Sequence, residues 1–78
     1  MPAMPLDVPV RLPVRLGQLL QLAGVVDTGA DARAVLAAGD VLVDGQAEDR
    51  RGRQLHGGEV VEIRSPGGVE QLRVVAGG

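Results

Sequence analysis

Arginine is the side chain whose number and spacing suggest a function for this 78-residue chain. All eight basic residues are arginines, and Arg50, Arg51 and Arg53 fall within four positions of one another. A guanidinium group is planar and permanently charged, and it binds phosphate through paired hydrogen bonds. The cluster therefore indicates a phosphate-bearing partner. A solvated surface turn is the simpler interpretation of the same pattern, because Glu48 and Asp49 adjoin the cluster and reduce its charge.

Residues able to act as nucleophiles or general bases are scarce. The chain has a single serine, Ser65, a single threonine, Thr28, and a single histidine, His56, with no cysteine, lysine or tyrosine. Nucleophilic and acid–base mechanisms need an adjacent base and an orienting group, and a metal site needs several clustered ligands. We therefore expect no enzymatic activity, no cofactor and no metal site.

The overall composition limits the kind of partner. The formal net charge is −2, so an anionic partner must be met by a local patch and not by bulk attraction. The chain has no aromatic residue, which excludes the ring-stacking surfaces of RRM and OB readers of RNA. No apolar run approaches the roughly 18 residues that cross a bilayer, and the first residues lack a secretion signal. We expect a monomeric, cytoplasmic protein with no membrane association.

The elements that position the arginines begin after a proline-rich stretch. Prolines at positions 2, 5, 9 and 13 predict an extended N-terminal arm over residues 1–13, of which residues 8–12 can lie along a sheet edge. A single domain is expected over residues 14–76, followed by a tail of residues 77–78.

Two helices are expected next. Leu16, Leu19 and Leu20 form an apolar stripe that predicts a helix over residues 14–23, in which Gly17 is a weakness. A second helix is expected between Thr28, which can cap its first amides, and Gly39. Its buried stripe consists of Ala32, Val35 and Leu36, which leaves Arg33 on the flank, reaching outward.

Strands should fill the second half of the chain. A strand over residues 41–43 precedes the hairpin signal Asp44-Gly45, and residues 46–48 return. The polar segment 49–53 then crosses over, with Leu55 as its apolar anchor. Residues 60–64 and 69–75 should form a second hairpin.

Three runs in this order resemble a known family. They are VVDTGADAR over residues 25–33, AGDVLVDG over 38–45 and EDRRGR over 48–53. Residues 16–63 thereby resemble the S-four-type RNA-binding domain first recognised in ribosomal small-subunit protein four, and in particular the small stand-alone bacterial proteins that consist of little else. The resemblance implies an α+β fold in which two antiparallel helices pack on a small, bent antiparallel sheet.

The resemblance also implies a partner and a site. The partner would be structured RNA, ribosomal or transfer RNA, with the ribosome as a candidate assembly. The RNA would be bound by one face made of the helix pair and the first hairpin. The positions that match RNA-binding positions of the family are Arg15, Gln18, Thr28, Arg33, Arg50, Arg51 and Arg53.

The chain departs from the family at four positions. Gln21, Leu42 and His56 stand where relatives often carry a basic residue, and Gly17 replaces a frequent aspartate. Each lost positive charge weakens attraction to phosphate, so the resemblance implies a lower affinity than is typical of the family.

Two alternatives belong to other functional classes. The chain ends in Gly77-Gly78, as ubiquitin-like sulfur carriers do. Those proteins, however, begin with a β-hairpin followed by one helix, whereas here a proline-rich arm is followed by two expected helices. A protein-interaction adaptor could instead use the outer face of the second helix, where Ala34, Ala37 and Ala38 permit close approach.

Overall fold

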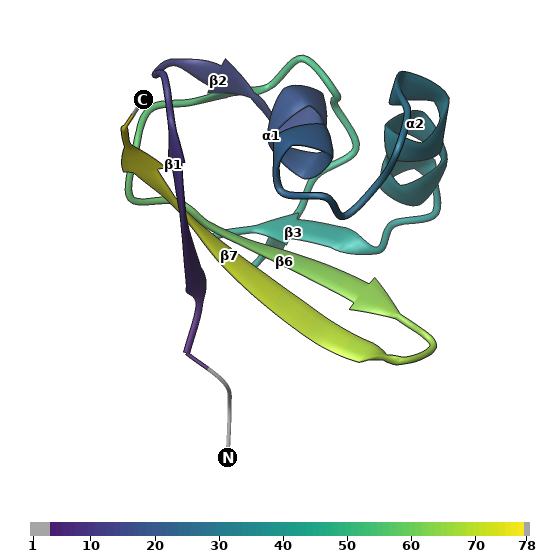
Figure 1. Cartoon of the computed structure of the whole chain (residues 1–78). Helices are drawn as coiled ribbons and strands as arrows, with labels where there is room; N and C mark the ends of the chain where they lie inside the picture. The colour runs from purple at the N-terminus through teal and green to yellow at the C-terminus, as the bar shows by residue number, and fades with distance from the viewer. Residues whose placement is uncertain (1–3, 78) are drawn as a thin grey trace.

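The computed structural model describes residues 4–77 and consists of a five-stranded sheet with two helices on one face (Figure 1). The sheet has the order β1 (Leu6–Val10), β7 (Gly68–Ala76), β6 (Val60–Ser65), β3 (Val41–Val43) and β4 (Gln46–Ala47). A second sheet pairs β2 (Val14–Arg15) with β5 (Gln54–Leu55), and the helices are α1 (Leu16–Leu22) and α2 (Gly29–Ala37). The predicted α+β class, with two helices on a small sheet, is confirmed.

The larger sheet is mixed and not purely antiparallel as expected. Strand β1 runs parallel to β7, with Val8 opposite Val74, whereas the other neighbours are antiparallel. Parallel pairing needs a long connection, and residues 11–67 lie between these two strands.

The expected N-terminal arm is therefore part of the folded unit. Val8 and Val10 are buried in the core, and β1 is an edge strand, where proline is tolerated. Residues 1–3 of the arm and Gly78 of the tail lie outside the described residues.

Helix α1 begins two residues later than predicted, because Val14 and Arg15 pair with Leu55 and Gln54 across the small sheet. The apolar stripe is confirmed, since Leu16, Leu19 and Leu20 are fully buried. The helix is followed by Gly24, whose φ of 75° is a left-handed conformation that glycine adopts without strain.

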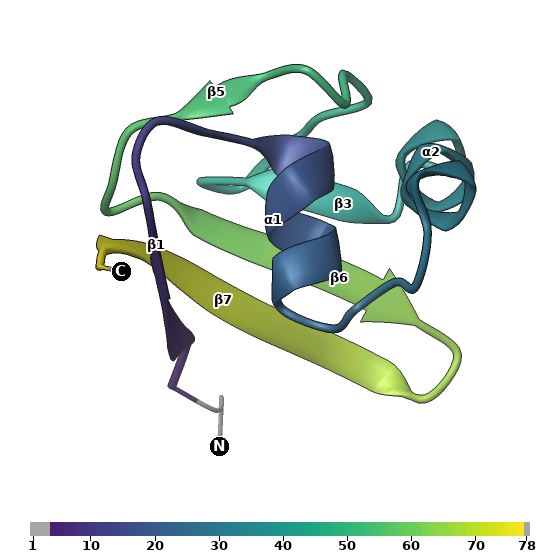
Figure 2. The same cartoon turned by 45° about the horizontal axis from the view of Figure 1, so that its top comes forward.

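Helix α2 has the predicted start. The Thr28 hydroxyl oxygen accepts a hydrogen bond from the Asp31 amide at 3.1 Å, which satisfies one of the donors left free at a helix start. Ala32 and Leu36 are buried and Val35 is half-buried against the core. The two views of the molecule place α1 and α2 on the same side of the sheet (Figure 2).

The hairpins also follow the sequence. Asp44 and Gly45 have φ angles of 51° and 84°, as the tight turn between β3 and β4 requires. In the second hairpin Ser65 pairs with Gly68, so the turn consists of residues 66–67. Leu55 is fully buried, as predicted, and holds the end of the segment that carries the arginine cluster.

Candidate nucleic-acid interface

The arginine loop, residues 49–53, is docked on the start of α1. The Leu16 amide donates to the Arg53 carbonyl at 2.8 Å, and the Gly17 amide donates to the Arg51 carbonyl at 3.0 Å. Amides in the first turn of a helix have no partner within the helix, so the loop satisfies them. This contact brings Arg51 next to a helix that lies far earlier in the chain.

Gly17 makes room for the Arg51 side chain. A Cβ atom at Gly17 would overlap the Arg51 Cγ atom, and a Cβ atom at Gly29 would lie 4.0 Å from the Arg51 Nη1 atom. The methylene groups of Arg51 therefore cross α1 at Gly17, and the guanidinium group lies near the start of α2. The glycine that weakens α1 by propensity is the residue that admits this side chain.

A concave site lies between the helices at this point. This interhelical cleft has a volume of about 310 Å³, and its polar lining comes from Arg15, Gln18, Gln21 and Arg51. No acidic residue lines it. The cleft can therefore accept an anion without repulsion from its own walls.

The other two arginines of the cluster are bound to Glu48, whose side chain is only 7% exposed. The Glu48 carboxylate accepts hydrogen bonds at 3.1 Å from Arg50 Nε, Arg50 Nη2 and Arg53 Nη1. It also accepts from the backbone amides of Asp49 and Arg50. The hydrogen bonds from Arg50, joined by the one from Arg53, outweigh the effect of burial and lower the pKa of Glu48 to about 2. Glu48 thus neutralises part of the cluster and fixes the shape of the loop.

Two further arginines are paired on the sheet. Arg64 pairs with Glu62 at 2.9 Å, and Arg73 approaches Asp7 at 3.7 Å. Within residues 4–77, the arginines that form no ion pair are Arg11, Arg15, Arg33 and Arg51.

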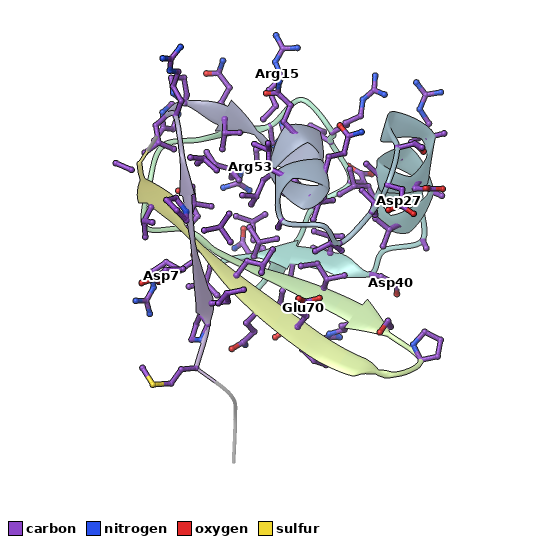
Figure 3. All side chains as sticks on the ribbon, viewed as in Figure 1. Asp7, Arg15, Asp27, Asp40, Arg53 and Glu70 are labelled. Carbon is purple, nitrogen blue, oxygen red and sulfur yellow. The ribbon has the colours of Figure 1, made fainter. Side chains whose placement is uncertain are left out.

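Figure 3 shows where several charged side chains lie. Arg15 points away from the sheet on the side of the helices, and Asp27 lies beside α2, whereas Asp7, Asp40 and Glu70 lie on the side of the sheet. The protein is weakly acidic overall, and yet unpaired positive charge lies beside α1.

The structure divides the seven residues predicted for the site into three groups. Arg15, Gln18 and Arg51 line the interhelical cleft. Arg33 is exposed on α2 outside the cleft lining, and Thr28 caps that helix. The third group consists of Arg50 and Arg53, which are held by Glu48.

Two residues of the site were missed from the sequence. Gln21 stands where relatives often carry a basic residue, and it lies one turn beyond Gln18 on the same helix face; this spacing is the signal that identifies it. Glu48 adjoins the arginine cluster in the sequence, but its burial has no local signal there.

Within residues 4–77 the structure has neither a cluster of metal-ligating side chains nor a helix that could span a membrane. No group of three or more His, Asp or Glu side chains that could hold a metal ion lies in this range. Neither helix in this part of the chain has the length and apolar character needed to cross a bilayer.

The features behind the two alternatives also have a place in the structure. The Gly77 amide donates to the Val10 carbonyl at 2.9 Å, so the first residue of the terminal diglycine is tied to the sheet. Gly78 lies outside the described residues. Ala34, Ala37 and Ala38 are exposed on α2, as the adaptor alternative requires.

Comparison with known proteins gives two matches. The sequence pattern of the S4 domain family matches residues 11–74. The chain is similar to a Bacillus subtilis (strain 168) protein described as "Probable ribosome maturation protein RlbA". The two are 44% identical over 54 residues, which cover 69% of this chain and 76% of that protein.

Proposed function

This chain belongs to the S4 domain family, and on that premise we propose that it binds structured ribosomal RNA during ribosome maturation. Family membership and the name of its Bacillus relative support a general RNA-binding or ribosome-related role. The two successive helices fit this family and not a sulfur carrier, in which a single helix is expected. We propose that the protein acts by binding and not by catalysis.

The observation that carries the proposal is the unpaired Arg51 in the interhelical cleft. Its two neighbours in the arginine loop are held by Glu48, whereas Arg51 makes no ion pair within the described residues. Arg15 lines the same cleft, and Arg33 adds an exposed charge on α2. In this proposal the three guanidinium groups bind phosphates of one RNA segment.

Recognition of this kind depends on the shape of the RNA. The bases of an A-form helix present their edges in a deep, narrow groove that side chains do not reach. Arginines on a rigid helix pair can instead match the spacing of phosphates along a stem or junction. Because Glu48 and the contacts with α1 fix the arginine loop, Arg51 is positioned before the RNA arrives.

We expect the affinity for RNA to depend on salt in proportion to the number of phosphate contacts. Three contacts, each contributing about 0.7 to 0.9, give a slope of roughly −2 to −3 for log K against log salt concentration. Fluorescence anisotropy with a labelled ribosomal RNA fragment at several potassium chloride concentrations measures this slope. A slope near zero would contradict phosphate binding, and a slope of about −4 would mean that Arg50 and Arg53 also bind RNA.

Replacing Gly17 with alanine should separate RNA binding from stability. Alanine favours the helix by up to about 1 kcal/mol, but its methyl group displaces the Arg51 side chain. We therefore expect the free energy of unfolding, measured by urea titration, to change by less than about 1 kcal/mol, while the affinity for RNA falls several-fold. The Gly67→Ala variant is a suitable control because Gly67 lies in the turn between β6 and β7, outside the cleft lining, and a Cβ atom there would lie 4.0 Å from the Ser65 Oγ atom, an ordinary van der Waals contact. Equal affinities of the two variants would contradict the path assigned to Arg51.

A further inference from the structure

We propose that the interhelical cleft receives one unpaired nucleotide of the RNA, with the base stacked on Arg51 and its edge bound by the amides of Gln18 and Gln21. This inference rests on the proposed RNA binding and adds what the cleft selects. The cleft would then bind an RNA that has an extruded base in preference to an RNA that offers only a regular stem.

The size and shape of the cleft favour a single protruding group. Its volume of about 310 Å³ is at the low end of the range of roughly 300 to 1,000 Å³ for sites that enclose small molecules. A paired stem is too wide to enter such a site, and its base edges are turned inward. An extruded nucleotide protrudes from the stem and exposes its hydrogen-bonding edge.

The amides of the lining favour a base over a bare phosphate. Each glutamine amide carries two donor hydrogens and an acceptor oxygen, and such amides pair with base edges through two hydrogen bonds. Gln18 Oε1 accepts from the Arg15 amide at 3.4 Å, which leaves its nitrogen free to donate. Within residues 4–77, Gln21 makes no hydrogen bond through its side chain. A phosphate would need donors alone.

The Arg51 side chain supplies the surface on which a base can lie. Its stem crosses Gly17 and its guanidinium group reaches toward Gly29, and both glycines line the cleft. A guanidinium plane stacks on a base and carries charge at the same time. The chain has no aromatic ring to serve instead. Arg15 adds a second positive charge to the lining for the phosphate that flanks the base.

The test uses two RNA hairpins that differ by one bulged nucleotide. The bulged nucleotide carries 2-aminopurine, whose fluorescence changes when it is stacked. We expect the full chain to bind the bulged hairpin at least about fivefold more tightly than the fully paired one, with a fluorescence change. Gln21→Ala removes one of the two amides that bind the base edge, so it should reduce this preference and leave the salt slope unchanged, because glutamine has no charge. Gln46→Ala, which alters an exposed glutamine on β4, should keep the preference.

A competition experiment separates base binding from phosphate binding. Uridine or adenosine monophosphate should displace the bulged hairpin at concentrations at which inorganic phosphate does not. Equal displacement by inorganic phosphate would overturn the inference. Equal, tight binding of both hairpins would also overturn it and would leave the proposed function intact. If the protein binds neither hairpin and also fails to bind a ribosomal RNA fragment, the proposed function itself is contradicted.

Discussion

Replacing Arg51 with glutamine should weaken binding of structured ribosomal RNA by about tenfold and make the salt slope shallower by about 1. A hydrogen bond to a charged group contributes roughly 1.5 to 3 kcal/mol, and each step of about 1.4 kcal/mol is a factor of ten in affinity. The variant should remain folded, because the Arg51 backbone carbonyl, and not its side chain, holds the start of α1. Anisotropy titrations measure the affinity, and circular dichroism checks the fold.

The matched control is Arg64→Gln, which removes the same charge from the sheet. Arg64 is 58% exposed and paired with Glu62, and we expect its replacement to change affinity by less than about twofold. Equal losses for the two variants would mean that binding depends on total charge and not on the cleft. Replacing Arg50, Arg51 and Arg53 together is a poorer test, because the change also removes the partners of Glu48.

Most of the fold is predictable from local sequence because its signals are local. The Thr28 cap and the Asp44-Gly45 turn act over a few residues, and both have the expected geometry. The pairing of β1 with β7 has no such signal. It joins segments from opposite ends of the chain, and the prolines at positions 5 and 9 argue against a strand until the edge position of β1 is known.

The candidate site was predictable only in part, because it depends on tertiary packing as well as on local sequence. Residue types identified an arginine cluster, but not which guanidinium group stays unpaired. That depends on the burial of Glu48, which tertiary packing decides, and on the contact between the arginine loop and α1. Gly17 shows the limit most clearly. Helix propensity makes it unfavourable, whereas the structure shows that a larger residue would collide with Arg51.

The Glu48→Gln variant should lose about 2 to 3 kcal/mol of stability at neutral pH. The pKa of Glu48 is about 2 in the folded protein, against 4.5 for an ordinary glutamate. A lowered pKa stabilises the fold at pH values above the ordinary value, and this stabilisation is lost as the pH falls from about 4.5 toward 2. The stability difference between wild type and variant should therefore shrink over the same interval. Urea unfolding at a series of pH values measures it.

The control for this prediction is Asp49→Asn, which removes an exposed carboxylate from the same loop. Within the described residues the Asp49 side chain accepts no hydrogen bond, so we expect a change below about 0.5 kcal/mol. A Glu48→Gln variant as stable as wild type at pH 7 would contradict the assigned role of Glu48.

The folded Glu48→Gln variant should also bind RNA with a salt slope steeper by about 1 to 2, because a neutral amide in place of the carboxylate no longer compensates the charges of Arg50 and Arg53. We therefore expect Glu48 to limit the number of arginines available to RNA while it stabilises the loop that presents Arg51.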